Sequence, residues 1–406
     1  NVSQVDPLPH QIDAVYYHAL KNPRLRFLIA DDPGAGKTIM AGLIIKELKY
    51  RGLIKKILIV APGHLKYQWL REMKEKFHEH FKIADRDMMD SSWGQNIFDE
   101  EDHLITSIDF AKQDDVVSSI KESHWDLIIV DEAHKMSAYK YGEKINKTRR
   151  YVFGETASEI SDYLLFLTAT PHRGDDENFR LFLDLLEPGF FADTAMLAES
   201  IQAKENPLFI RRLKEDMKNF NGEPIFPPRT VTTMQFNLSD EEKELYNAVT
   251  SYVQVHFNKA LAKEKRNVVF AMIILQRRLA SSVRAVRKSL IRRRNRLQDL
   301  YDQSEKIIDS DISVSKYLDD LPENERWKQE EELLLRLTSA ESREELKVEI
   351  DMLDTLIDLA KEVEYKQVET KLLELQSVIN QQDIKKSKKK LLIFTEARDT
   401  LDYLIE

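Results

Sequence analysis

The chain has 406 residues, of which 42% are hydrophobic and 32% charged, and it contains no cysteine. This composition predicts a globular protein of about two or three domains and excludes a disordered chain, a disulfide framework and a thiolate metal site. The formal net charge of −9 excludes a uniformly basic surface, so any cations that bind nucleic acid have to be clustered.

The sequence predicts no membrane segment and no secretion signal. Residues 1–9 lack the basic and then apolar order of a signal peptide, and no apolar run approaches the ~20 residues needed to span a bilayer. The ten histidines include no HExxH pair. We therefore expect a cytoplasmic protein without a structural metal.

Short apolar runs alternate with amphipathic segments through the first half of the chain. Runs without polar alternation are typical of strands buried on both faces, and the amphipathic segments predict the helices that connect parallel strands. The predicted strands are Phe27–Ala30, Ile57–Val60, Leu104–Thr106, Leu127–Val130 and Leu164–Leu167. The predicted helices are 37–51, 64–79 and 178–187. This pattern indicates an α/β domain with a parallel sheet.

After Ser239 the pattern changes to long amphipathic helices, and a strand-like run returns only at Leu391–Phe394. The predicted helices of this part are 240–265, 268–299, 325–338 and 342–381. Three prolines predict an extended connector ahead of them; they are Pro224, Pro227 and Pro228. We therefore predict an α/β domain, a helical insertion and the start of a second α/β domain, over 1–238, 239–387 and 388–406.

A phosphate-binding loop is predicted at residues 30–38, where Ala-Asp-Asp-Pro-Gly-Ala-Gly-Lys-Thr follows a strand and opens a helix. Its glycines let backbone N–H groups face the phosphates, Lys37 would reach the β- and γ-phosphates, and the Thr38 hydroxyl would bind Mg²⁺. Asp31 departs from the general pattern, which has glycine there. The residues assigned to nucleotide binding in this loop are Asp32, Gly34, Ala35, Gly36, Lys37 and Thr38.

Two adjacent carboxylates, Asp131 and Glu132, end the strand-like run that begins at Trp125. The carboxyl ends of parallel strands lie at the same edge of the sheet as a phosphate-binding loop. Asp131 can therefore bind Mg²⁺, and Glu132 can orient and deprotonate an attacking water. Together with Lys37 these residues predict a catalytic site for ATP hydrolysis.

The segment Asp131–His134 is similar to the DEAH box of superfamily-two helicases, and an ordered set of motifs around it resembles the SWI/SNF family of DNA translocases. Those other motifs are Leu8–Gln11, Ile59–Trp69, Leu104–Ser107, Leu167–Pro171, Leu208–Arg212, Phe226–Arg229 and Leu391–Glu396. The resemblance implies RecA-like lobes, ATP and Mg²⁺ as cofactors, and movement along duplex DNA. Ala30–Thr38 and Thr170–Gly174 resemble bacterial members, such as the RNA-polymerase-recycling ATPase and helicases of phage-defence islands, which implies protein partners in a larger complex.

The resemblance also implies roles for residues outside the phosphate-binding loop. Gln11 would contact the adenine. Residues of the Ile59–Trp69 motif would touch the nucleic-acid backbone, namely Pro62, His64 and Gln68. Three others would couple the nucleotide site to lobe movement, namely His134, Thr168 and Thr170.

A basic stretch lies between Lys263 and Leu297, with twelve Lys or Arg and one acid. It is a candidate second nucleic-acid surface, with Arg277, Arg278 and Arg284 as phosphate contacts. The alternative is that its arginines pair with the acidic helices that follow. The sequence leaves both open.

Hydrolysis in this architecture needs an arginine from the second lobe, and the printed sequence stops just after that lobe's first motif. We therefore expect a fragment that binds ATP and Mg²⁺ but turns ATP over poorly by itself. Two other functions stay open, namely a strand-separating or RNA-directed helicase, and a nucleotide-switched interaction subunit of a defence or transcription complex.

Overall fold

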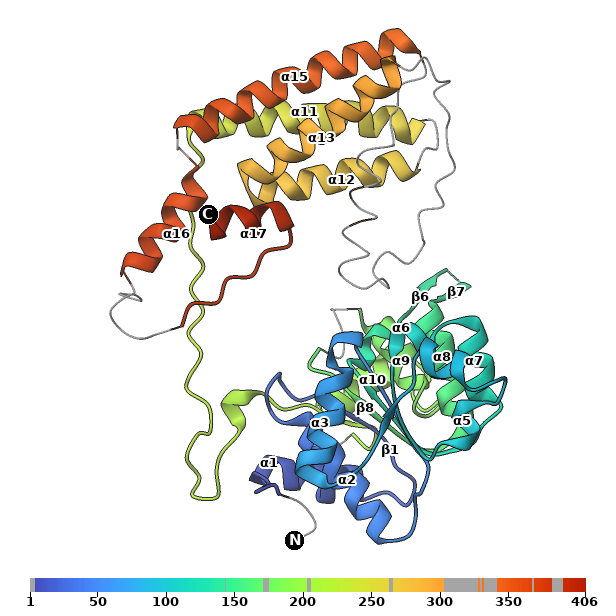
Figure 1. Ribbon diagram of the computed structural model, residues 1–406. Helices are drawn as coiled ribbons and strands as arrows, with labels where there is room; N and C mark the ends of the chain where they lie inside the picture. The colour runs from blue at the N-terminus through green and yellow to red at the C-terminus, as the bar shows by residue number, and fades with distance from the viewer. Residues whose placement is uncertain are drawn as a thin grey trace. The chain divides into compact units, whose positions relative to one another are not determined.

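The computed structural model divides the chain into two compact units, Asn1–Thr230 and Val231–Glu406 (Figure 1). It describes residues 4–142, 144–170, 175–202, 206–262, 266–302, 328, 331, 342–366, 369–381 and 390–406. Most of the predicted helix 325–338, residues Pro171–Gly174 of the bacterial-type motif and residues 388 and 389 lie outside this part of the chain.

The first unit is built on a seven-stranded parallel sheet with strand order β3-β4-β2-β5-β8-β1-β9. The strands are β1 (Arg26–Ile29), β2 (Ile57–Ala61), β3 (Lys82–Ile83), β4 (His103–Ser107), β5 (Trp125–Asp131), β8 (Ser161–Leu167) and β9 (Phe209–Ile210). The five predicted strands are thus confirmed. The edge strands β3 and β9 were not predicted, because two residues are too few to produce a periodic pattern.

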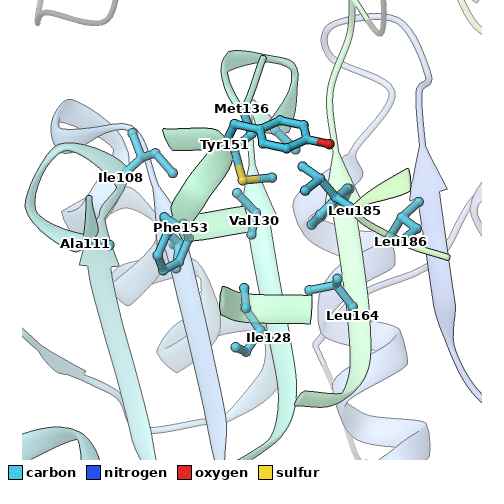
Figure 2. Close-up of a cluster of buried hydrophobic side chains, with 14 of the residues drawn as sticks. Ile108, Ala111, Ile128, Val130, Met136, Tyr151, Phe153, Leu164, Leu185 and Leu186 are labelled. Carbon is cyan, nitrogen blue, oxygen red and sulfur yellow. The ribbon is translucent and has the colours of Figure 1, made fainter. Parts of the chain in front are cut away.

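Each central strand of the sheet contributes side chains to two separate cores. Along β5, Leu127 and Ile129 pack on one face of the sheet, while Ile128 and Val130 pack on the other. Figure 2 shows Ile128 and Val130 grouped with side chains from neighbouring elements on that second face. Burial on both faces explains why these strands read as continuous apolar runs.

Helices cover both faces of the sheet. On one face lie α2 (Lys37–Tyr50) and α3 (Lys66–Phe77), which pack so closely that a Cβ on Gly42 would lie 2.2 Å from the Phe77 ring. On the other face lie α8 (Arg149–Ile160) and α9 (Asp176–Asp184). The remaining described elements are α1 (Pro9–Ile12), η1 (Asp13–Ala19), η2 (Gly63–Leu65), α4 (Arg86–Ser91), α5 (Ile97–Glu100), α6 (Ile108–Ala111), α7 (Asp114–Lys121), η3 (Ala133–Lys135), the hairpin β6 (Ala138–Tyr141) and β7 (Lys144–Lys147), α10 (Thr194–Gln202) and η4 (Lys214–Asp216).

The second unit is helical in its described residues and has its own apolar core. Its helices are α11 (Asp240–Ala262), α12 (Arg266–Ser281), α13 (Val283–Asp302), α15 (Arg343–Lys366), α16 (Thr370–Gln381) and α17 (Arg398–Ile405). The prediction of one helix over 268–299 is wrong, because the chain breaks at Ser282, whose hydroxyl accepts the N–H of Ala285 at 3.1 Å. Such a cap satisfies the first turn of α13 and favours a break over a continuous helix. The helix predicted over 342–381 is likewise two helices.

The strand predicted at Leu391–Phe394 is also wrong for this structure. These residues have neither helical nor strand conformation, and Leu392 and Phe394 are exposed. A strand needs a neighbour that takes its hydrogen bonds, and no described segment pairs with this one. The assignment of 388–406 to a second α/β domain stays a prediction.

Residues 227–239 contain neither helix nor strand, as the prolines of the predicted connector indicate. Among the described residues, no helix is both long enough and apolar enough to cross a membrane.

Candidate nucleotide-binding and active site

The loop between β1 and α2 has the backbone of a phosphate-binding loop. Gly34 and Gly36 have φ values of 83° and 85°, a left-handed conformation that favours glycine. A Cβ on Gly36 would also lie 2.4 Å from the Gln11 amide nitrogen. Gly36 caps α2, and Lys37 and Thr38 are its first two residues, so the free N–H groups of the helix face the loop.

The Lys37 amine lies inside this loop. It donates to the backbone carbonyl of Asp31 at 2.9 Å and to that of Asp32 at 3.4 Å. Burial lowers the pKa of Lys37, while the charges of Glu132 and Asp131 act in the opposite direction. The structure therefore brings the predicted lysine and the predicted carboxylates into one electrostatic environment.

The buried side chain of Gln11 lies against the loop. Its amide nitrogen donates to the Ala35 carbonyl at 3.1 Å, and its amide oxygen accepts the N–H of Leu8 at 2.9 Å. The ring Nε2 of His10 lies 2.9 Å from the same Ala35 carbonyl. The amide nitrogen and the amide oxygen of Gln11 thus both have protein partners, and its contact with adenine stays a prediction.

The two predicted carboxylates lie where β5 ends, at the carboxyl edge of the sheet, with Asp131 as the last residue of the strand and Glu132 directly after it. The Asp131 carboxylate accepts the indole N–H of Trp69 at 2.9 Å and the backbone N–H of Glu132 at 2.9 Å. Burial raises the pKa of Asp131, and the hydrogen bond from Trp69 opposes that rise. Trp69, on α3, holds one of the predicted metal ligands, a role that its position in the sequence did not reveal.

Glu132 has a left-handed backbone, with φ of 50° and ψ of 41°. Non-glycine residues adopt this conformation infrequently, and such residues gather at functional sites. Its carboxylate lies 3.2 Å from Nδ1 of His134. That contact is the largest cause of the lowered pKa of Glu132, so the carboxylate is ionised at neutral pH.

His134 connects the carboxylates to the end of β8. Its Nδ1 lies 2.7 Å from the hydroxyl of Thr168, and that hydroxyl accepts the N–H of Thr170 at 3.1 Å. Thr168 is fully buried, and its own N–H donates to the carbonyl of Ile29, at the end of β1. The three predicted coupling residues therefore form one hydrogen-bonded network.

The predicted nucleic-acid contacts of the Ile59–Trp69 motif follow β2 at the same edge of the sheet. Pro62 is buried, whereas His64 and Gln68 are exposed. The Gln68 amide donates to Glu72 one turn along α3 at 2.9 Å. Two of the three residues are thus accessible, and Gln68 directly precedes Trp69, the partner of Asp131.

The other three predicted nucleic-acid contacts lie in the second unit and form ion pairs. Arg284 lies 2.8 Å from Glu364 of α15, and its guanidinium also contacts Glu406. Arg277 pairs with Glu396 at 2.8 Å. Arg278 pairs with Asp399 at 3.2 Å. The structure therefore contains ion pairs of these arginines with carboxylates that follow in the chain, and their contact with phosphate stays a prediction.

An unpredicted ion pair borders the phosphate-binding loop. The side chain of Asp31 is fully buried and lies 2.5 Å from the guanidinium of Arg212, which also pairs with Asp13 at 2.9 Å. Asp31 does not have a positive φ, so its backbone does not require the glycine of the general pattern. The aspartate at position 31 was the only sign in the sequence of this ion pair. Its partner, Arg212, lies too far along the chain for the sequence pattern to identify it.

We expect Trp69→Phe to slow ATP hydrolysis by about 10- to 100-fold, because a hydrogen bond to a charged group contributes roughly 1.5–3 kcal/mol. Loss of the indole donor raises the pKa of Asp131 further. Asp131 is ionised only above its pKa. As the pH falls, the variant should therefore lose activity at a higher pH than the wild type. A pH profile of the ATPase rate measures this.

Trp125→Phe is the matched control, because its buried indole donates to Ser123 at 3.1 Å near the opposite end of β5. If the ATPase rate of Trp69→Phe falls on the acid side at the same pH as that of the wild type, Trp69 does not affect the pKa of Asp131.

Comparisons with known proteins show which family the chain belongs to. The profile of the SNF2-related domain family matches residues 10–285. The uncharacterized ATP-dependent helicase YqhH of Bacillus subtilis is 32% identical over 325 residues, which are 76% of this chain and 52% of YqhH. The RNA polymerase-associated protein RapA of Vibrio atlanticus is 34% identical over 195 residues, 47% of this chain and 20% of RapA. The chain thus spans about half of one relative and a fifth of the other.

A solved structure with similarity to this chain is the Sulfolobus solfataricus SWI2/SNF2 ATPase core in complex with dsDNA. It has a TM-score of 0.43 and 19% sequence identity, and the match covers 69% of this chain and 59% of that one.

Proposed function

Because this chain belongs to the SNF2-related family, we propose that it is the ATP-hydrolysing part of a motor that moves along duplex DNA. One observation carries the proposal, namely that Lys37, Asp131 and Glu132 share one site at the carboxyl edge of a parallel sheet. Phosphoryl transfer needs this combination of a phosphate-binding cation, a metal-binding carboxylate and a base for water.

Each side chain has a defined task in this proposal. Lys37 exchanges the carbonyls of Asp31 and Asp32 for oxygens of the β- and γ-phosphates. Glu132, ionised because its pKa is lowered, accepts a proton from the attacking water. The lowered pKa keeps Glu132 in its basic form at neutral pH. The His134 ring contacts both the Glu132 carboxylate and the Thr168 hydroxyl.

Thr38 and Asp131 suit Mg²⁺, which prefers hydroxyl and carboxylate oxygens. Asp131 fits because its partly buried carboxylate accepts neutral N–H groups and forms no ion pair with Lys or Arg in the described part of the chain. Bound Mg²⁺ would neutralise charge on the β- and γ-phosphate oxygens.

The nucleic-acid side of the proposal rests on η2 and the start of α3. His64 and Gln68 are exposed at the same edge of the sheet as the nucleotide site, and Trp69 next to Gln68 holds Asp131. A contact at Gln68 is therefore one residue from the side chain that orients a metal-binding carboxylate. This short connection is a physical route by which nucleic acid can stimulate hydrolysis.

The test is the ATPase rate of the protein with duplex DNA, single-stranded DNA, RNA or no nucleic acid. We expect the largest stimulation by duplex DNA, and no activity above background in Lys37→Ala under any condition. Stimulation by RNA or single strands alone would favour a strand-separating or RNA-directed helicase. ATP binding without stimulation by any nucleic acid would favour a nucleotide-switched interaction subunit.

A further inference from the structure

The phosphate-binding loop is paired along its first residues with a segment from far along the chain, residues 208–214. Hydrogen bonds run from the N–H groups of Leu28, Ala30 and Asp32 to carbonyls of this segment, at 2.8, 2.8 and 3.2 Å. The carbonyl that Asp32 meets belongs to Arg212. The pairing of β1 with β9 thus continues past the end of the strand and into the loop.

Side chains reinforce this pairing. The Asp31 carboxylate accepts the backbone N–H of Arg212 at 3.1 Å, its Nε at 3.2 Å and its Nη2 at 2.5 Å. The Asp32 carboxylate accepts the N–H of Lys214 at 3.1 Å. The two acidic residues of the loop therefore have their side chains bound to one short segment.

Asp31 joins this segment to the catalytic lysine. Its side chain binds Arg212, while its backbone carbonyl accepts the amine of Lys37 at 2.9 Å. Asp31 is fully buried, and a buried carboxylate without a cation is strongly unfavourable. Without Arg212, the buried Asp31 carboxylate has no cation within ion-pair distance among the described residues, and a movement of this side chain toward water would disturb the carbonyl that holds Lys37.

We propose that Arg212 is a positioning residue of the nucleotide site, which acts through Asp31 to hold the loop in its phosphate-binding shape. This inference rests on the proposed function, since it concerns the same site. The segment that carries Arg212 leads on toward Thr230, the end of the first unit. Because coupling between two sites is reciprocal, a change in this segment alters ATP affinity, and bound ATP stabilises the segment.

The test measures the dissociation constant for ATP and the thermal stability of Arg212→Gln, Asp31→Asn and the double variant. We expect each single variant to bind ATP about 10- to 100-fold more weakly, the loss typical of a displaced binding group. The double variant should bind ATP no more weakly than either single variant, because each single substitution already removes the Asp31–Arg212 ion pair.

Glu79→Gln is the matched control. Glu79 is also a buried carboxylate, and it pairs with Lys46 and Lys49 of α2 at 2.5 and 2.6 Å, away from the phosphate-binding loop. This variant should lose thermal stability and keep the wild-type affinity for ATP.

If the pair has a purely structural role, Arg212→Gln should behave like Glu79→Gln. A lower melting temperature with unchanged ATP affinity in Arg212→Gln would therefore overturn the proposal. Failure of the wild-type protein to bind ATP would instead refute the proposed function. The two failures are distinct, because one appears only in variants and the other in the unaltered chain.

Discussion

Glu132→Gln should abolish most ATP turnover while leaving ATP binding intact. The substitution keeps the size of the side chain and removes its ability to accept a proton, and general-base catalysis typically contributes about 10²–10⁴-fold. We therefore expect kcat to fall by at least about 10²-fold, with a dissociation constant for ATP close to that of the wild type. Steady-state hydrolysis with saturating duplex DNA, together with a nucleotide-binding titration, measures both quantities.

The pH dependence of the wild type identifies the groups involved. Burial raises the pKa of Asp131, whereas the contact with His134 lowers the pKa of Glu132. Loss of activity on the acid side should therefore begin at a higher pH than an unperturbed aspartate would give, and Trp69→Phe should move it further. Glu155→Gln is a control, since Glu155 pairs with Lys147 in the β6–β7 hairpin region. Glu132→Gln with wild-type turnover would show that another group activates the water.

Loss of the Glu349 carboxylate should destabilise the helical unit by about 3–5 kcal/mol, the usual cost of leaving a buried charge without its partner. Glu349 of α15 accepts a hydrogen bond from Arg293 of α13 at 2.7 Å and one from Tyr252 of α11 at 2.8 Å. Arg293 also donates to Tyr252 at 2.9 Å. All three side chains are buried, so one polar network joins three helices.

Hydrogen exchange of the α13 and α15 amides in Glu349→Leu measures this loss for the helical unit itself. The double variant Arg293→Met with Glu349→Leu should recover part of it, because it removes both charges but leaves the buried Tyr252 hydroxyl without these two partners. Asp354→Ala, which breaks the more exposed pair with Arg294, should cost at most about 1 kcal/mol. Equal exchange in Glu349→Leu and Asp354→Ala would show that the buried network does not hold the helices together.

The basic stretch between Lys263 and Leu297 is a case in which the sequence could not decide between two interpretations. Twelve cations with one acid are consistent with a nucleic-acid surface and with an ion-paired helix. The structure pairs Arg284 and Arg287 with the same Glu364 of α15, which lies 80 and 77 residues further along the chain. Which cations meet carboxylates depends on how the helices pack, and charge counts do not contain that information.

The sequence by itself determined the parallel sheet, the phosphate-binding loop and the two carboxylates, because each is a local signal. Doubly buried strands are continuous apolar runs, and a loop or acidic pair at the end of a strand is contiguous in the chain. Tertiary structure alone decided which side chains hold those groups in place. Trp69 reaches Asp131 and Arg212 reaches Asp31 across long separations in the chain. Their contacts follow from strand order and helix packing, which no local pattern encodes, and they explain why an aspartate stands where the loop pattern has glycine.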